Sequence, residues 1–288
     1  EYCARHGKEH DESFVPEPGF KPGTEQPAFV LATAEGPVAG AAALLLGGSW
    51  GRSGRGRFAL IHADVPREAA PESYRALVKA SALAARDHVR ELYLFLPESA
   101  TVALEALEGL GFARERVVYG MEAPIVHASR PEAPAGWRLV PVSADDEAAI
   151  VEFVAVRNRN FKEVLGAHDA SAEDVREALG SATALEGGHL ILRDASGAAR
   201  GTIFLERDDE EGVLFIGSVS VDWETRGRSL GRFLIRSALA FGAERGFSKA
   251  FLSVNALNRS AGTVPRACSM GMTHWSSPSM AIMPCVLN

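Results

Sequence analysis

The sequence is poor in the features that define several large classes of protein. It has three cysteines in 288 residues, Cys3, Cys268 and Cys285, and an odd, widely spaced set does not build a disulfide framework. No apolar run is long enough to span a membrane, and no secretory leader is recognisable. A net charge of −7 argues against nucleic acid as the main partner. We therefore expect a cytoplasmic protein without membrane or nucleic-acid partners.

Two common phosphate-binding motifs are absent as well. No Gly-Lys-Ser/Thr sequence follows a glycine-rich loop, which excludes a P-loop, and no GxGxxG is present, which argues against a dinucleotide-binding domain. Hydrophobic residues make up 47% of the chain and charged residues 23%, which is typical of a globular protein. A chain of 288 residues is long enough for two domains.

One stretch of the second half carries the strongest local pattern. GVLFIGSVSV (Gly212–Val221) is apolar and β-branched, which predicts a buried strand. DWETRGRSLGR (Asp222–Arg232) follows, then a helical pattern that ends at Gly246 and the strand KAFLSV (Lys249–Val254). A loop of small residues that opens a helix exposes free N–H groups at the positive end of the helix dipole. The pattern therefore predicts a phosphate site at this loop.

The motif RGRSLG resembles the acyl-CoA loop of the GNAT acetyltransferase superfamily, Q/R-x-x-G-x-G/A. Arg226 takes its first position, Ser229 replaces the middle glycine, and Gly231 takes the last. SVSV resembles the fourth strand of that family, and the sequence from Asn258 to Ala261 resembles its N-x-x-A. The alternative is a structural strand, turn and helix with solvated arginines.

The resemblance implies acetyl-CoA as co-substrate. Backbone groups near Val219 and Val221 would hold the thioester carbonyl, and the N–H groups of Gly227–Gly231 would hold the pyrophosphate. Ser229 would be tolerated because serine can also cap the helix. The expected cofactor-binding residues are Val219, Ser220, Val221, Arg226, Gly227, Arg228, Ser229, Leu230, Gly231, Arg232 and Asn258.

Catalytic groups are harder to name from the sequence. Glu206 is the candidate general base, with Glu211 nearby, in the region where such enzymes often keep a carboxylate facing the amine; exposed hairpin charges are the alternative for both. The family often has a Tyr after N-x-x-A that protonates the leaving thiolate, and here no Tyr follows Asn258. Pro265 would also break or kink a helix in this segment.

The chain has the pattern of a tandem repeat. Two hairpins, within Pro27–Gly47 and within His189–Glu206, share a similar pattern, and strand, loop, helix, strand and helix then follow each of them. We expect an α/β (α+β) fold of two tandem GNAT-like domains, each a mixed, mostly antiparallel sheet flanked by helices. Their predicted bounds are 1–124 and 137–288, with a linker at 125–136. The first copy has VPREAAPES (Val65–Ser73) in place of the loop, which suits phosphate poorly.

Four local predictions complete the sequence analysis. Ser143 and Ser171 are expected to cap helices. Arg52, Arg55 and Arg57 are interpreted as a solvated hairpin loop. The C-terminal tail lacks the pattern of a closing strand, apart from a fragment at Ala281–Met283. Cys3, His6 and His10 form a weak metal motif without a fourth ligand, and we expect no metal.

The predicted function is acetyl transfer from acetyl-CoA to a primary amine of a small molecule or peptide, by direct attack of the amine. The alternative is an acyl-CoA-binding sensor or pseudoenzyme that has lost turnover. We expect a monomer or homodimer, because a tandem pair can satisfy internally an interface that single copies use to dimerise.

Overall fold

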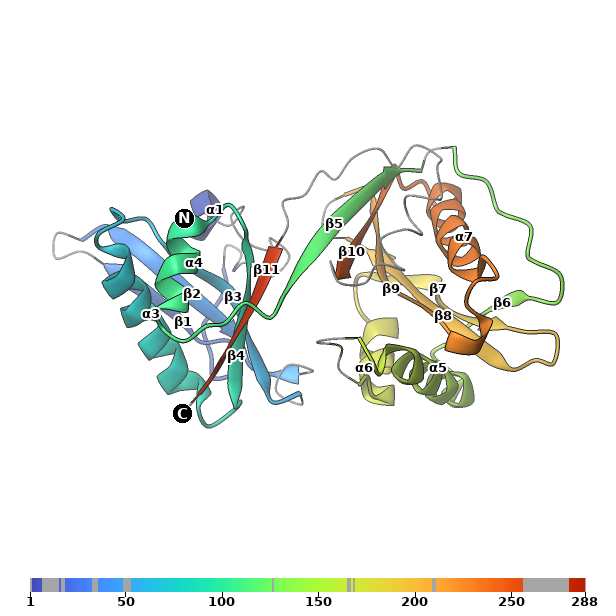
Figure 1. Cartoon of the computed structure of the whole chain (residues 1–288), viewed down its shortest axis with the longest axis horizontal. Coiled ribbons are helices and arrows are strands. Elements are labelled where there is room, and N and C mark those ends of the chain that lie inside the picture. Colours follow the sequence, from blue (N-terminus) through green and yellow to red (C-terminus); the bar gives the residue numbers. More distant parts are fainter. Residues whose placement is uncertain are drawn as a thin grey trace. The chain divides into compact units, whose positions relative to one another are not determined.

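A computed structural model of the chain shows two compact units. The first comprises Glu1–Tyr119 with Pro278–Asn288, and the second comprises Gly120–Ser277. Figure 1 shows both, and each is described by itself. No helix among the described residues is long and apolar enough to cross a membrane. The structure describes residues 2–6, 16, 19–32, 36–48, 53–125, 127–164, 167, 169–208, 211–255 and 280–287.

The first unit is built on a mixed sheet with the strand order β1-β2-β3-β4-β11-β5. Neighbouring strands are antiparallel except β3 and β4, which are parallel. Its elements in chain order are α1 (Tyr2–His6), β1 (Ala28–Ala32), β2 (Val38–Leu45), β3 (Arg55–Ala63), α3 (Ala70–Ala85), β4 (Glu91–Pro97), α4 (Thr101–Glu108), the first residues of β5 (Arg116–Pro124) and β11 (Met280–Val286).

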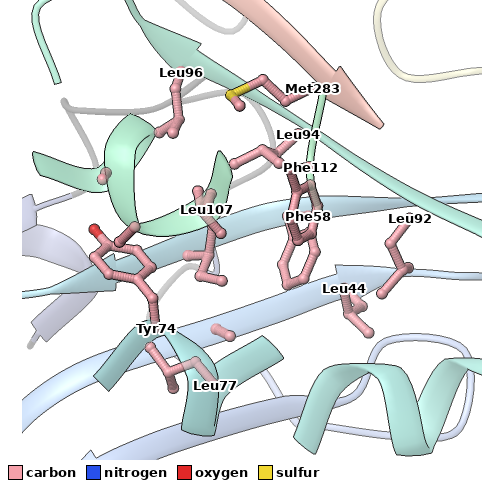
Figure 2. Close-up of a cluster of buried hydrophobic side chains, with 14 of the residues drawn as sticks. Leu44, Phe58, Tyr74, Leu77, Leu92, Leu94, Leu96, Leu107, Phe112 and Met283 are labelled. Atoms are coloured by element: carbon pink, nitrogen blue, oxygen red, sulfur yellow. The ribbon is translucent and has the colours of Figure 1, made fainter. Parts of the chain in front are cut away.

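Helices α3 and α4 cover one face of this sheet over a continuous apolar core. Leu44, Phe58 and Leu94 point from the strands toward Tyr74 of α3 and Leu107 of α4, as Figure 2 shows. All five side chains are almost completely buried. Removing this much apolar surface from water is the main stabilising term for such a unit.

The last strand of the chain is part of this first core. The tail was expected to lack a closing strand beyond Ala281–Met283, and this expectation is wrong, because β11 pairs with β4 from Met280 to Val286. It also pairs with β5 at three positions. Ala281 and Met283 are completely buried, so the strand is held by long-range pairing and burial rather than by a local alternating pattern. The strand Met280–Val286, assigned from sequence to the second domain, thus pairs within the first unit.

The second unit has the strand order β5-β10-β9-β8-β7-β6, with β9 and β10 parallel. Helix α5 packs against β8 and β9, and α7 against β9 and β10, from opposite faces of the sheet (Figure 1). Its elements are β6 (Arg138–Pro141), α5 (Glu147–Phe161), α6 (Ala172–Leu179), β7 (Ala184–Arg193), β8 (Ala199–Arg207), β9 (Val213–Val221), the 3-10 turn η3 (Trp223–Thr225), α7 (Leu230–Glu244) and β10 (Lys249–Asn255), with the last residues of β5.

The two units repeat the same strand pairing residue by residue. Gly40 of β2 lies opposite Ala63 of β3, and Gly201 of β8 lies opposite Val221 of β9. In both pairs a β-bulge interrupts the register a few residues further on. The tandem repeat and the mixed, mostly antiparallel sheets predicted from the sequence are therefore confirmed.

Some local predictions need correction. Helix α5 is capped by Asp146, whose side chain accepts from the Ala149 N–H, so the prediction of Ser143 as cap is wrong. Ser171 caps α6 with a capping box, as predicted. Arg55 and Arg57 belong to β3, and Arg57 is only 5% exposed with its guanidinium 4.5 Å from the Phe95 ring centroid. Phe95 of β4 covers Arg57, and Arg55 is paired with Glu91 of β4 and with Glu115, which precedes β5. Arg52 lies outside the described residues.

Candidate acyl-CoA site

The site begins where β9 and β10 separate. They pair from Val213 to Phe215 of β9, and the described pairing with β10 ends there although β9 continues to Val221. Gly217 is the extra residue of a bulge against β8, since Leu205 pairs with Ile216 and Phe204 with Ser218. A Cβ at Gly217 would lie 2.7 Å from the Phe204 ring. A bulge bends its strand, so the end of β9 diverges from β10 and leaves one backbone edge for a ligand.

The predicted loop connects this strand to α7 through an unusual backbone. Gly227 has φ +80° and Ser229 has φ +59°, both in the left-handed region. Ser229 alone among the described non-glycine residues has a positive φ, which costs roughly 1–2 kcal/mol for a residue with a Cβ. Ser229 takes the N-cap position, but its side chain makes no capping hydrogen bond, so the expected capping role is wrong.

Backbone donors converge at this loop. Within the described part of the chain, none of the N–H groups from Gly227 to Gly231 donates a hydrogen bond of ordinary geometry. Turn η3 ends just before them with hydrogen bonds from Thr225 N to Asp222 O and from Arg226 N to Trp223 O. Five successive unbonded donors at the start of the fifteen-residue helix α7 have the arrangement with which a helix start can bind an anion.

The arginines of the motif lie at the surface around these donors. Arg226, Arg228 and Arg232 are all exposed. The Arg226 guanidinium lies 4.8 Å from the Trp223 ring centroid, and its Nε donates to Val221 O at 3.3 Å. The three guanidinium groups add positive charge to a helix start, which favours phosphate.

The other predicted residues fall into three groups. Val219 and Val221 lie half-buried on the diverging end of β9, whereas the Ser220 hydroxyl is buried against Asn160 (3.1 Å) and Thr202 (2.8 Å). Glu206 of β8 lies opposite Phe215, at the level where β9 and β10 part, and accepts from the Thr183 hydroxyl at 3.1 Å. Asn258 lies outside the described residues.

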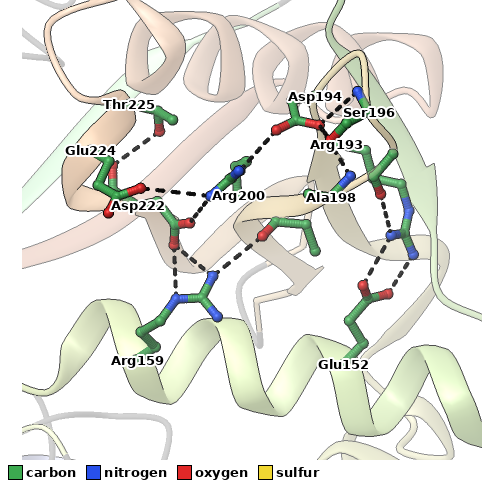
Figure 3. Close-up of polar contacts among 12 residues, drawn as sticks. Glu152, Arg159, Arg193, Asp194, Ser196, Ala198, Arg200, Asp222, Glu224 and Thr225 are labelled. Carbon is green, nitrogen blue, oxygen red and sulfur yellow. Dashed lines mark hydrogen bonds and ion pairs between the residues drawn. The ribbon is translucent and has the colours of Figure 1, made fainter.

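A charged network under the loop was missed by the sequence analysis. Asp222, which follows β9 directly, accepts from Arg159 Nε (3.1 Å) and Nη2 (2.7 Å) of α5, and Arg200 Nη1 of β8 lies 3.6 Å from its second oxygen. Arg200 also donates to Asp194 at 2.8 Å (Figure 3). Hydrogen bonds from Ser196 and Arg200 hold the pKa of Asp194 far below its usual range.

This network holds the base of the loop. Asp222 is 6% exposed, and its carbonyl accepts from both the N–H and the hydroxyl of Thr225, each at 3.0 Å. The carboxylate thus ties α5 and β8 to the first turn of the loop, as Figure 3 shows. The three residues of this clamp, Asp222, Arg159 and Arg200, are far apart in sequence, so no local pattern could have identified them.

The first unit has the same strand, but the donors in its loop do not form a continuous run. The N–H groups of Ala69 and Ala70 are bonded to the carbonyls of Pro66 and Arg67, and Pro71 in the first turn of α3 has no N–H. Asp64 takes the position of Asp222, and its side chain is 67% exposed, 3.7 Å from His6.

The N-terminal Cys3 and His6 lie on α1, and His10 is outside the described residues. The His6 ring stacks on His62 with centroids 4.3 Å apart. Among the residues that the structure describes, no group of three or more His, Cys, Asp or Glu side chains is arranged to hold a metal ion.

These features define the class of the protein: a tandem α/β chain with a glycine-bearing, donor-rich loop in its second copy. Residues 153–263 match the model of the acetyltransferase (GNAT) family. Members of this family transfer acetyl groups from acetyl-CoA.

Solved structures show the same fold along nearly the whole chain. A GCN5-related N-acetyltransferase from Sphaerobacter thermophilus aligns with a TM-score of 0.72 and 19% identity, over 94% of this chain and 83% of its own. A tandem GNAT protein from the clavulanic acid biosynthesis pathway aligns with a TM-score of 0.63 and 18% identity, over 93% of this chain and 85% of its own. A GCN5-related N-acetyltransferase from Kribbella flavida aligns with a TM-score of 0.55 and 18% identity, over 86% of each chain. No curated protein matches the sequence.

Proposed function

We propose that this protein is an N-acetyltransferase that transfers the acetyl group of acetyl-CoA to a primary amine of a small molecule or peptide. The run of unbonded N–H groups from Gly227 to Gly231 carries the proposal. Donors that have no partner in the protein fit the pyrophosphate of CoA, and a Cβ-free Gly227 leaves open space above the loop. Residues 137–288 without the last strand would form the catalytic copy.

Acetyl-CoA supplies an activated acetyl thioester when it is bound. The diverging end of β9 offers backbone N–H groups near Val219 and Val221 that would stabilise negative charge on the thioester carbonyl oxygen. The amine attacks the carbonyl carbon, the carbon–sulfur bond breaks, and the amine loses one proton. We assign that proton to Glu206, which lies at the level where the strands separate, whereas Glu211 is exposed in the turn before β9.

The first test is calorimetric titration with acetyl-CoA and with desulfo-CoA, which cannot react. We expect both to bind at one site per chain. Arg226→Glu should lower the affinity for both ligands by roughly tenfold or more, because it replaces a favourable charge at the phosphates by a repulsive one. Arg67→Glu, in the corresponding loop of the first copy, is the matched control and should change neither affinity. Unchanged affinity in Arg226→Glu would exclude this loop as the cofactor site.

The chemical step is tested by Glu206→Gln, with Glu211→Gln as control. Release of free CoA thiol in the presence of amines should fall by about 100-fold or more in Glu206→Gln, the usual contribution of a general base, with acetyl-CoA affinity unchanged. Equal turnover in the two variants would remove Glu206 from the mechanism.

A second candidate function, acyl-CoA binding without turnover, is favoured by one observation. The last of the four tyrosines is Tyr119, so the second copy has no phenol to protonate a leaving thiolate. Binding of acetyl-CoA without thiol release for any amine in a broad screen would favour this alternative.

A further inference from the structure

Trp223 is the most exposed large hydrophobic side chain in the described part of the chain. It exposes 75% of its surface, although tryptophan is on average highly buried. Leaving an indole in water forgoes a large hydrophobic gain. A side chain kept in this state at the edge of a binding loop is expected to act on a ligand.

The indole is held in place and is open on one side. Trp223 begins η3, the turn fixed by the carbonyl of Asp222, and its own carbonyl accepts from Arg226 N at 3.2 Å. The Arg226 guanidinium covers one face of the ring at 4.8 Å. Because the residue is still 75% exposed, the opposite face is open to solvent. The pair forms a preformed flat surface, and little ordering is required when a ring stacks on it.

This surface adjoins the donors assigned to the pyrophosphate. Gly227 follows Arg226 directly, so the five free N–H groups begin next to the stacked pair. In CoA the adenine is joined to the pyrophosphate through a single ribose. A pyrophosphate at the loop therefore leaves the adenine within reach of neighbouring surface, and purines stack well on tryptophan. In the first copy, which lacks the continuous run of unbonded donors, the residue after Asp64 is the half-buried Val65.

We propose that the open face of Trp223 is the stacking site for the adenine ring of CoA. This inference rests on the proposed function, because it assumes that the loop holds the pyrophosphate. It assigns to Trp223 a role in affinity for the nucleotide part of the co-substrate, with no part in the chemical step.

The test compares acetyl-CoA with S-acetyl-4′-phosphopantetheine, which lacks the adenosine, its 3′-phosphate and one phosphate of the pyrophosphate, so each variant is compared with the wild-type protein for the same ligand. Affinities are measured by calorimetry for the wild-type protein, Trp223→Ala and Trp223→Phe, with circular dichroism to verify folding. Trp223→Ala should lower the affinity for acetyl-CoA about tenfold, as expected for loss of one base–aromatic stack. The affinity for the truncated ligand should change by no more than about twofold. Trp223→Phe should restore most of the affinity. In fluorescence titrations, Trp223→Phe should abolish quenching by CoA, and Trp137→Phe should retain it.

Three results would overturn the proposal, and they are distinguishable. Equal weakening of both ligands in Trp223→Ala would mean that the indole acts only by holding Arg226. Unchanged affinity for both would place the adenine elsewhere, with the loop assignment intact. Absence of acetyl-CoA binding to the wild-type protein would overturn the proposed function and this inference with it.

Discussion

The strands β3 and β9 have the same pairing, and only β9 leads to the proposed phosphate site. Each strand pairs with its parallel neighbour at three positions, and the last paired residue is Arg57 in β3 and Phe215 in β9. Each strand also has a bulge two residues after that position, at Ala59 in β3 and at Gly217 in β9. Beyond the strands the copies differ. At the start of α3 the N–H groups of Ala69 and Ala70 are bonded and Pro71 has none, whereas five successive N–H groups before and at the start of α7 are unbonded.

The comparison shows that the sheet does not determine the ligand site. The strand register places a loop at the same position twice, and backbone conformation in a few loop residues decides whether N–H groups face a ligand. Positive φ at Gly227 and Ser229 has no counterpart in the loop of the first copy. The following three experiments test this comparison.

The largest effect is expected from Met283→Ala on β11, which should affect the first copy alone. The side chain is completely buried in the core of that unit, so its loss should cost about 2–5 kcal/mol. Hydrogen exchange should show lost protection in β2–β4 and unchanged protection in β7–β9. Val286→Ala on the same strand, 65% exposed, is the control. Equal loss of protection in both copies would show that they do not unfold separately.

The second experiment uses pH to separate the copies. His189 is buried between Phe153 and Phe204, and desolvation lowers its pKa to about 4. The unfolded histidine then binds a proton that the folded one excludes, so stability is full above pH 6.5 and falls toward pH 4, by up to about 3 kcal/mol. The first copy has Ala28 at this register position. His189→Phe should flatten the pH dependence of denaturant unfolding between pH 7 and 5; an unchanged slope would contradict this.

The smallest effect is expected from breaking the clamp. Asp222→Ala leaves Arg159 and Arg200 without their shared carboxylate. Because both arginines are partly exposed, we expect the free energy of unfolding to fall by about 2 kcal/mol rather than by the full cost of breaking a buried pair. Acetyl-CoA affinity should also fall. Asp64→Ala, at the same position of the first copy, should cost less than about 0.5 kcal/mol. Similar losses in the two variants would mean that the clamp is not specific to the second copy.

Much of the second copy could be predicted from sequence because its signals are local. The strand Val213–Val221, the glycine-bearing loop and the helix to Glu244 follow one another directly, and hydrophobic periodicity and glycine placement describe such neighbours well. The two hairpins could be predicted from the sequence for the same reason. Ser143 was assigned a cap that belongs to Asp146 because both residues suit that position and only the backbone path distinguishes them.

The remaining predictions failed where distant residues decide. Arg57 looked like a solvated loop residue, and its burial depends on Phe95 of another strand. The tail looked irregular, and β11 exists because β4 and β5 provide hydrogen-bond partners on both edges.

The sequence by itself determined the repeat, the fold class and the phosphate-type loop, because each depends on residues close together in the chain. Only the tertiary structure decided that α7 begins with a continuous run of unbonded donors and that the run at α3 is interrupted, that Asp222 is clamped by Arg159 and Arg200, and that the last strand completes the first unit. These are matters of long-range pairing and of backbone dihedral angles, and a one-dimensional pattern of residue types does not specify which distant partner a strand edge or a buried charge will meet.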